Sequence, residues 1–549
     1  MPKTKLLVLG FMILGLVLRV TWLTKYPAGF TPDEAAFGYN AYSILQTGKD
    51  EWGTPWWQLF FTNMRSFGDY KLPLYTFLTI PSIKIFGLSE FATRLPNAII
   101  GTLAIGAIYL LTRKLFQNLN IENSLKIENC KLKIEEIASF MFAISPWAIS
   151  MSRGAFEANL ATLFLPLAIY LFLKSKYWLS AVIFAVSFYS SHSARSVTPL
   201  IIITLIAFFK KLDKKLILTG LFFGMLLIPG LISMISKGSS RVADVSILSP
   251  TGGWGAVSDR RFEARIVGLP DNISRLFSNK PVYIVSTFVK NYLSYWSPQF
   301  WFTSGAGEST YGMITGRGTF YYIELVFLLS FFVIMVRRPQ KKYWLMLFLA
   351  ALSFVPGALS KGPGYAASRA VIALPFLIIM LSVGAENVLK KKSLIILISI
   401  IYFLSTLFFV EDYIYHAPKS NAVAMNYGWT DLIPRLMPIA RRFDEVRFGR
   451  SLSEPHIFLA FYTKIDPKVY QQYSLGWPEF EKKGLKFLDQ YDGYYLDKYR
   501  FGDLKYEDKV TKPTLFVGRP DEFPSDVGYY IKVYYPNGIP AMLVVEKQP

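Results

Sequence analysis

The chain has 549 residues, of which 52% are hydrophobic and 16% aromatic, and its mean hydropathy is +0.32. This composition is too apolar for a soluble protein of this length, and it predicts a protein with many membrane spans. The formal charge of +21 does not indicate a nucleic-acid-binding domain, because Lys and Arg occur in short clusters between apolar runs. The single cysteine, Cys130, excludes an internal disulfide framework and a cysteine-rich metal site, and it argues against redox chemistry.

Apolar segments of membrane length recur along the chain. A helix needs roughly 20 apolar residues to cross a bilayer. The first segment follows Lys3 and Lys5, and no small-residue cleavage site comes after it, so we interpret it as an uncleaved span. The sequence predicts about eleven spans, at residues 6–23, 95–116, 134–151, 160–173, 178–189, 197–209, 216–235, 320–336, 343–359, 371–388 and 394–410.

The positions of the basic clusters predict the orientation of these spans. If the N-terminus is cytoplasmic, every loop on the cytoplasmic side is rich in Lys and Arg, which is the usual bias of membrane proteins. These clusters lie at residues 113–133, 174–176, 210–215, 337–342 and 390–392. The odd number of spans then places the C-terminus outside. We therefore expect a multi-pass protein of the bacterial cytoplasmic (plasma) membrane with an extracytoplasmic C-terminal part.

The long apolar runs stop after residue 410, which predicts a boundary between two domains. Residues 1–410 would form the transmembrane domain, and residues 411–549 an external domain, called the tail domain below. Strand-like stretches occur at 457–462, 514–517 and 529–535, and residues 424–443 fit a helix. This pattern is typical of a small α/β domain.

The first outer loop, residues 24–94, gathers charged and aromatic residues. Asp33 and Glu34 stand directly after the first span, and for them we favour a functional role. Asp50 and Glu51 are expected to be solvated loop residues, because carboxylates in loops usually face water.

Four blocks of this loop carry a resemblance to a known family. In order they are DEAAFGYNAY at 33–42, TGKDEWG at 47–53, FGDYKLPLY at 67–75 and FGLSEFATRLP at 86–96. They resemble the N-terminal module of the bacterial protein-mannosyltransferase-like enzymes, which are related to the dolichyl-phosphate-mannose-protein mannosyltransferases and the lipid A aminoarabinose transferases. Leu72 departs from the pattern, since relatives usually have a second proline there. The resemblance implies a polytopic α-helical fold of GT-C type, with about eleven transmembrane helices, interfacial helices in the first outer loop and an external α/β domain.

The same resemblance implies an inverting glycosyltransferase that uses a polyprenyl-phosphate-linked monosaccharide at the outer face of the membrane. The acceptor hydroxyl would belong to a protein, a glycolipid or a polysaccharide of the cell envelope, and the sugar would be a hexose or a pentose. Such a reaction needs a carboxylate that takes the proton of the acceptor and cations that stabilise the departing phosphate.

Three acidic residues are the candidates for catalysis. Asp33 matches the catalytic acidic residue of the family and would act as general base, while Glu34 would assist or orient it. Glu157, between the third and fourth predicted spans, matches a second acidic position of the family. For Glu157 the alternative is a plain ion pair with Arg153 at helical spacing.

Six further residues are candidates for binding the phosphate or sugar of the donor: Lys71, Asp69, His192, Arg195, Arg241 and Arg369. Lys71 matches a Lys-Pro element of the family, and a role as an interfacial anchor stays equally open for it. Asp69 would position Lys71 or contact the acceptor. Besides His192 the chain has only His416 and His456, which argues against a histidine metal site. A divalent metal held by carboxylates stays open, and no other cofactor is assigned.

Two other classes of protein compete with this interpretation. A lipid or glycan transporter or flippase would also be polytopic, but such proteins typically show repeated halves and charged, broken spans near the midplane. Here the charges gather at the outer ends of the spans. A noncatalytic surface module would not need about eleven spans as an anchor. The sequence therefore favours a glycosyltransferase.

Overall fold

The computed structural model describes residues 3–117, 133–209, 213–236, 246–362, 365–485, 487–507 and 509–549. The candidate Arg241, and Cys130 in the predicted basic loop, lie outside the described residues. The helices are α1 Lys3–Val20, α2 Pro32–Thr47, α3 Leu59–Thr62, α4 Leu74–Phe86, α5 Glu90–Phe116, α6 Ile134–Ile144, α7 Pro146–Arg153, α8 Ala161–Leu173, α9 Tyr177–Phe188, α10 His192–Phe209, α11 Lys214–Ser236, α13 Pro250–Ile266, α14 Asp271–Phe277, α15 Lys280–Ser294, α16 Glu324–Arg337, α17 Lys341–Ala358, α18 Ala367–Ala370, α19 Leu374–Val388, α20 Lys392–Glu411, α21 Ala417–Asn421, α22 Trp429–Ala440, α23 Pro455–Thr463, α24 Pro467–Ser474 and α25 Pro478–Lys482. The strands are β1 Met64–Ser66, β2 Asp69–Lys71, β3 Glu445–Gly449, β4 Tyr494–Leu496, β5 Tyr499–Gly502, β6 Thr514–Gly518, β7 Ile531–Tyr534 and β8 Pro540–Lys547.

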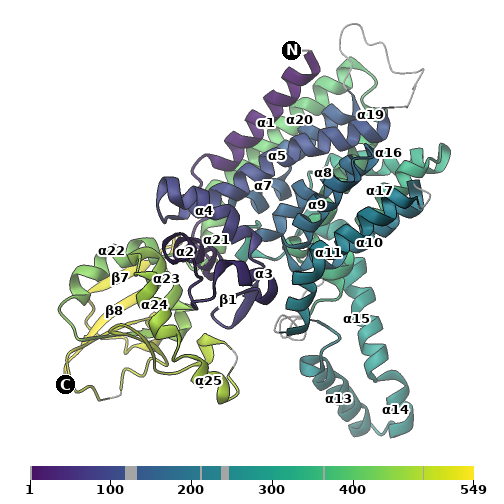
Figure 1. Cartoon of the computed structure of the whole chain (residues 1–549). Coiled ribbons are helices and arrows are strands. Elements are labelled where there is room, and N and C mark those ends of the chain that lie inside the picture. The colour runs from purple at the N-terminus through teal and green to yellow at the C-terminus, as the bar shows by residue number, and fades with distance from the viewer. Residues whose placement is uncertain are drawn as a thin grey trace.

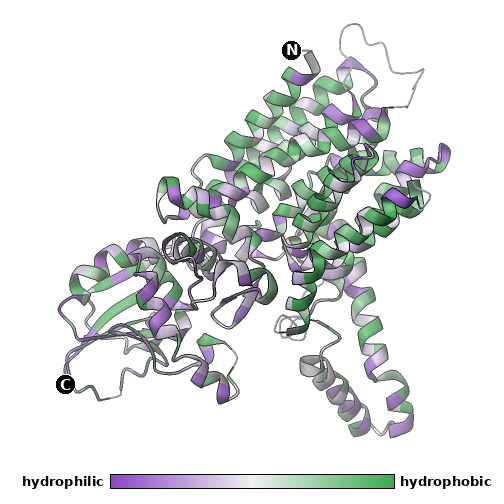
Figure 2. Cartoon of the chain, in the orientation of Figure 1, coloured by the Kyte–Doolittle hydropathy of each residue, from purple (hydrophilic) through white to green (hydrophobic). Residues whose placement is uncertain are grey.

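Each apolar segment predicted from the sequence is helical, and together these helices form one bundle (Figure 1). Hydrophobic residues dominate the bundle, whereas the tail domain is mixed (Figure 2). Within the described part of the chain, five helices are long and apolar enough to cross a membrane by length and composition: Glu90–Phe116, His192–Phe209, Lys214–Ile235, Ala367–Val388 and Lys392–Asn421. The predicted helical fold is thus confirmed, and the number of about eleven spans stays a prediction.

The predicted span at 134–151 is broken into α6 and α7. Ser145 caps α7 and Pro146 is its first residue, where a proline lacks the N–H that would continue the preceding helix. The break frees carbonyls at the end of α6, and the buried Arg19 of α1 donates to two of them, Ala143 O at 3.0 Å and Phe142 O at 3.2 Å. Arg19 therefore has a structural role within the bundle.

The tail domain contains a six-stranded mixed sheet in the order β4-β5-β3-β6-β8-β7. The strands predicted at 514–517 and 529–535 are confirmed as β6 and β7, and the predicted helix is present as α22. The strand predicted at 457–462 is wrong, since this stretch belongs to helix α23. Its residues from Ile457 to Phe461 are buried on all sides, and a fully buried apolar run shows no periodicity that separates a helix from a strand.

The tail domain packs on α2, the helix that carries Asp33 in its first turn (Figure 1). The rings of Phe30 and Phe461 lie 4.9 Å apart. Gly38 permits this close approach, because a Cβ at its position would lie 2.6 Å from the ring of Phe461. Gln471 of α24 donates to Thr47 Oγ1 at 3.0 Å. The first loop and the tail domain thus share one hydrophobic core, which places the tail domain at the Asp33 end of the bundle.

Candidate active site

Asp33 lies in the first turn of α2, where the chain builds a complete N-terminal cap. Thr31 Oγ1 accepts from the backbone N–H of Glu34 at 3.3 Å, and the Glu34 carboxylate accepts from the N–H of Thr31 at 3.1 Å. Pro32 occupies the first helical position, which suits its fixed φ. The cap holds Glu34 against the protein, while the side chain of Asp33 remains 37% exposed. The two adjacent carboxylates therefore have different surroundings.

Glu34 is buried and forms an ion pair with Arg94 of α5. Its Oε1 accepts from Arg94 Nε at 2.8 Å and from the N–H of Ala155 at 2.9 Å, and its Oε2 accepts from Arg94 Nη2 at 3.0 Å. The same guanidinium donates to the carbonyl oxygens of Leu23, Pro27 and Gly29. Glu34 thus ties the start of α2 to α5 and to the loop that leads to Glu157. Its fully buried carboxylate fits the predicted orienting role and not direct participation in the chemistry.

Lys71 is the last residue of strand β2 in the β1–β2 hairpin, and its ammonium group contacts Asp33. Its Nζ lies 2.5 Å from Asp33 Oδ1 and 3.2 Å from Asp69 Oδ2. The residue is only 2% exposed, and its ammonium lies 4.7 Å from the ring centre of Phe67. A phosphate would have to displace a carboxylate to reach this ammonium. The geometry therefore favours a lysine that holds the two carboxylates over the predicted direct phosphate ligand.

A cavity of about 510 Å³ opens in front of Asp33. Its lining brings together Asp33, Asp69 and Glu157 from three separate parts of the chain, and Glu454 and Arg519 from the tail domain. Three of the predicted site residues therefore converge on one space. Because the side chain of Asp33 is partly exposed there, it can contact a bound hydroxyl group.

The other predicted site residues lie at varying distances from this cavity. His192 Nε2 lies 3.1 Å from the carbonyl oxygen of Tyr70, so His192 contacts the hairpin that carries Lys71. Arg195 is buried one turn further along α10, where Nη1 donates to Ser233 Oγ at 3.2 Å. Arg369 Nη1 donates to the carbonyl oxygen of Lys361 at 3.2 Å. The described lining residues include neither Arg195 nor Arg369.

The guanidinium of Arg153 contacts backbone carbonyl oxygens, whereas its helical spacing from Glu157 had suggested an ion pair with that carboxylate. It donates to the carbonyl oxygens of Leu18, Thr21, Trp22 and Tyr26, at the end of α1. These bonds tie the segment that follows α1 to Arg153, the last residue of α7. Arg153 therefore positions the start of the first loop.

Asp50 and Glu51 are completely buried, so the expectation that they are solvated is wrong. Burial raises the pKa of Asp50 to about 6 and that of Glu51 to about 8. Glu51 Oε1 accepts from Ser66 Oγ at 2.7 Å, and the N–H of Glu51 donates to Asn40 Oδ1 at 2.9 Å. Glu51 thus links α2 to the hairpin that carries Asp69 and Lys71.

The raised pKa of Glu51 predicts a pH-dependent stability. Between the ordinary pKa of 4.5 and the folded value of about 8, the unfolded chain has released the proton and the folded protein still holds it. The free energy of unfolding should therefore fall as the pH rises through this window, by about 1.4 kcal/mol for each unit of raised pKa. Glu51→Gln should flatten this part of the profile in thermal unfolding of the detergent-solubilised protein. Identical pH profiles of the two proteins would contradict the assignment.

Several residues of the site were not singled out from the sequence. Arg94 stands within the matched block at 86–96, so the resemblance contained a signal for it. Glu454 and Arg519 are separated from Asp33 by more than four hundred residues, and no local pattern marks them. Only the packing of the tail domain on α2 brings them to the cavity.

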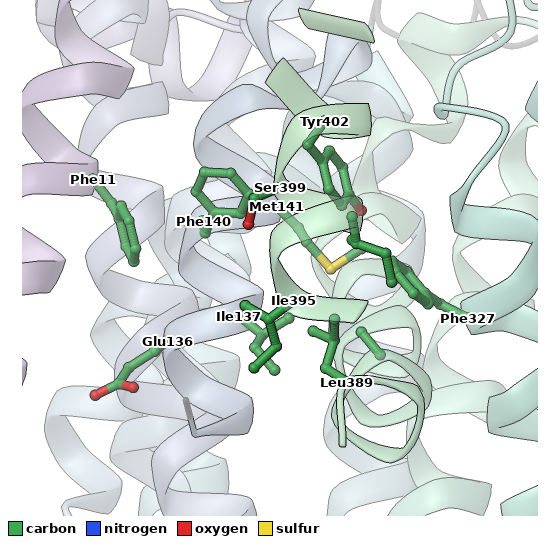
Figure 3. Close-up of a pocket in the computed structure, with 12 residues that line it drawn as sticks. Phe11, Glu136, Ile137, Phe140, Met141, Phe327, Leu389, Ile395, Ser399 and Tyr402 are labelled. Carbon is green, nitrogen blue, oxygen red and sulfur yellow. The ribbon is translucent and has the colours of Figure 1, made fainter. Parts of the chain in front are cut away.

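A second cavity, of about 230 Å³, lies inside the helical bundle (Figure 3). Phe11, Phe140 and Phe327 contribute to its apolar lining. Its one carboxylate among the described lining residues, Glu136, accepts from the N–H of Lys133 at 3.0 Å and so caps the start of α6. The Asp33 cavity, in contrast, is lined by four carboxylates among its described residues, Asp33, Asp69, Glu157 and Glu454, and we take it as the candidate active site.

No protein-family model and no curated protein sequence matches the chain. Solved structures do resemble it. ArnT from Cupriavidus metallidurans bound to undecaprenyl phosphate has a TM-score of 0.47 and 12% identity, with 98% of this chain and 97% of that chain covered. The oligosaccharyltransferase AglB from Archaeoglobus fulgidus, in complex with an inhibitory peptide and a dolichol-phosphate, has a TM-score of 0.48 and 13% identity, with 100% and 74% covered.

Proposed function

We propose that this protein is an inverting glycosyltransferase that moves a monosaccharide from a polyprenyl-phosphate donor to an acceptor hydroxyl bound in front of Asp33. The observation that carries the proposal is the convergence of Asp33, Asp69 and Glu157 on one cavity at the end of an apolar bundle. A lipid-linked donor can keep its chain beside the bundle while its sugar reaches this cavity. The concentration of the candidate catalytic carboxylates at one end of the bundle favours a transferase over a transporter.

The proposed reaction needs one proton acceptor and one leaving group. The acceptor oxygen attacks C1 of the sugar, and Asp33 takes the hydroxyl proton. The bond between C1 and the phosphate oxygen breaks on the opposite face of the sugar, and the polyprenyl phosphate leaves with the electron pair. Lys71 holds Asp33 at 2.5 Å, which fixes the direction of the carboxylate.

Arg195 is retained as a proposed contact of the donor phosphate. Its Nε and Nη2 are buried and have no hydrogen-bond partner within the described part of the chain. A guanidinium with two such nitrogens suits the planar, two-point recognition of a phosphate.

The proposal also keeps the predicted topology, with a cytoplasmic N-terminus and the tail domain on the outside of a bacterial plasma membrane. Hexoses and pentoses are the sugars to test.

The function can be tested with the purified protein in lipid vesicles. A panel of polyprenyl-phosphate hexoses and pentoses is offered with candidate peptide, glycolipid and polysaccharide acceptors, and products are identified by mass spectrometry. We expect transfer with inversion at C1 from at least one donor, and loss of that transfer in Asp33→Asn. Comparison of the surface glycans of cells with and without the protein identifies the natural acceptor. Release of the sugar across the vesicle membrane without any transfer product would instead support a transporter.

Lys71→Ala is expected to lower kcat by at least about 10-fold, because a misdirected base loses much of its contribution. The KM for the donor should change much less, since the ammonium faces the carboxylates. Lys71→Arg should restore part of kcat. Steady-state kinetics in vesicles separate the two constants. A large rise of the donor KM at unchanged kcat would show that Lys71 binds the phosphate directly.

A further inference from the structure

Helices α13, α14 and α15, residues 250–294, form an arm that projects away from the bundle beside α11 (Figure 1). The base of the arm is firmly attached. The ring of Tyr295 stacks on Phe354 at 5.1 Å, and Asn291 Nδ2 donates to the carbonyl oxygens of Ala358 at 3.2 Å and Ser360 at 3.1 Å. The outer turns of α15 therefore extend from a fixed support.

Inside the arm, α13 folds back on α15 through few contacts. The ammonium of Lys280 lies 3.3 Å from the ring centre of Trp254, and Arg261 Nε donates to the carbonyl oxygen of Ser278 at 2.6 Å. Val257 and Ser274 are buried between the helices. This interior is too small to cover the apolar side chains that the arm carries.

One face of α15 is apolar and exposed. Val282, Val285, Val289 and Leu293 follow each other at helical spacing and are between 41% and 61% exposed. Five further large apolar residues around the tip of the arm are at least 66% exposed: Phe262, Ile266, Val267, Leu276 and Phe277. An apolar surface of this extent usually marks contact with a membrane or with another protein.

The charges of the arm distinguish between these two partners. Residues 250–294 contain six Lys and Arg against three Asp and Glu. Arg265, Arg275 and Lys280 are exposed beside the apolar residues of the tip. Apolar side chains interleaved with basic ones are typical of helices that lie in the interface of a membrane and attract anionic lipids.

The connections of the arm place its base at the Asp33 end of the bundle. Helix α10 begins at His192, beside Tyr70 of the first loop, so α10 runs away from this end and α11 returns to it. The segment after α11 contacts the end of α17, where the N–H of Ile247 donates to the carbonyl oxygen of Leu359 at 2.9 Å. The arm therefore emerges where the helices leave the bilayer.

We propose that the arm lies on the membrane surface at the Asp33 end, with its apolar face among the upper acyl chains and its Arg and Lys side chains against anionic headgroups. The partner is the lipid surface itself. This inference does not depend on the proposed transfer reaction, since the geometry of the arm alone carries it.

The test measures the depth of single positions in the full-length protein. In a Cys130→Ser background, Val285→Cys, Phe277→Cys and, as a water-exposed control on the tail domain, Ser525→Cys each receive a nitroxide spin label. The proteins are placed in vesicles of phosphatidylcholine with and without phosphatidylglycerol. We expect the labels at 277 and 285 to be several-fold more accessible to oxygen than to a water-soluble nickel chelate, and the label at 525 to show the reverse. Phosphatidylglycerol should increase the contrast.

A second variant tests whether the basic side chains of the arm contribute to membrane binding. Arg265→Glu with Arg275→Glu should reduce the depth of the label at 285 in the anionic vesicles and leave it unchanged in phosphatidylcholine. Aqueous accessibility at 277 and 285 equal to that at 525 would overturn the proposal. Protection that grows with the protein-to-lipid ratio would overturn it too, because it would assign the apolar face to a second copy of the chain. These measurements need no turnover, so they remain informative if no sugar transfer is found.

Discussion

Asp33→Asn is expected to lower the rate of sugar transfer by about 100- to 10,000-fold, which is the usual contribution of a general base. The amide has the size of the carboxylate but cannot take the acceptor proton. Folding should be retained, because the cap of α2 depends on Thr31 and Glu34 and because Lys71 keeps its contact with Asp69. Turnover is measured in vesicles with a polyprenyl-phosphate donor, and donor binding is measured separately.

Two controls refine this result. Asp69→Asn removes the charge of another carboxylate in the same cavity. It tests whether the loss of any negative charge there lowers turnover as much as the loss of the base. Glu157→Gln is the same control for a third carboxylate of the cavity. We expect smaller losses in both than in Asp33→Asn. Normal turnover of Asp33→Asn would remove Asp33 from the role of base, and a larger loss in Glu157→Gln would transfer that role to Glu157.

The sequence alone predicted the helical bundle well, because an apolar run of membrane length has few alternatives to a helix. It predicted the break between α6 and α7 poorly, since Pro146 lies within an otherwise continuous apolar run. The helix α23 was predicted as a strand for a related reason, the absence of a polar face. Local patterns thus fail where a segment is buried on every side.

The candidate site shows the same limit in its carboxylates. Asp33 and Glu34 are adjacent in the sequence, and only contacts from distant segments separate their roles. Glu34 meets the N–H of Ala155, 121 positions further on, and Arg94 of α5. Asp50 and Glu51 resemble ordinary loop carboxylates, yet α2 and the hairpin close over them. The identity of the acidic residues was therefore visible in the sequence, whereas their burial depended on tertiary structure.

Loss of the Glu34–Arg94 ion pair is expected to lower the free energy of unfolding by about 3–5 kcal/mol, because either single substitution leaves the other charge buried without its partner. Glu34→Gln leaves the guanidinium of Arg94, and Arg94→Ala leaves the carboxylate of Glu34. Arg94 also loses its bonds to Leu23, Pro27 and Gly29, so we expect Arg94→Ala to be the more destabilised of the two. Unfolding of the detergent-solubilised variants by heat or denaturant measures the effect.

The chain offers a matched control in the Arg435–Asp431 pair of α22, whose side chains are 45% and 54% exposed. Asp431→Asn should cost less than about 1 kcal/mol, as for other surface ion pairs. Turnover measurements then show whether Glu34 only stabilises the site or takes part in the reaction. If it only stabilises the site, Glu34→Gln unfolds at lower temperature but retains part of its turnover where it is folded, because Asp33 still acts as the base. If Glu34 takes the proton itself, Glu34→Gln has no turnover even where it is folded, and the assignment of Asp33 as the base fails with it.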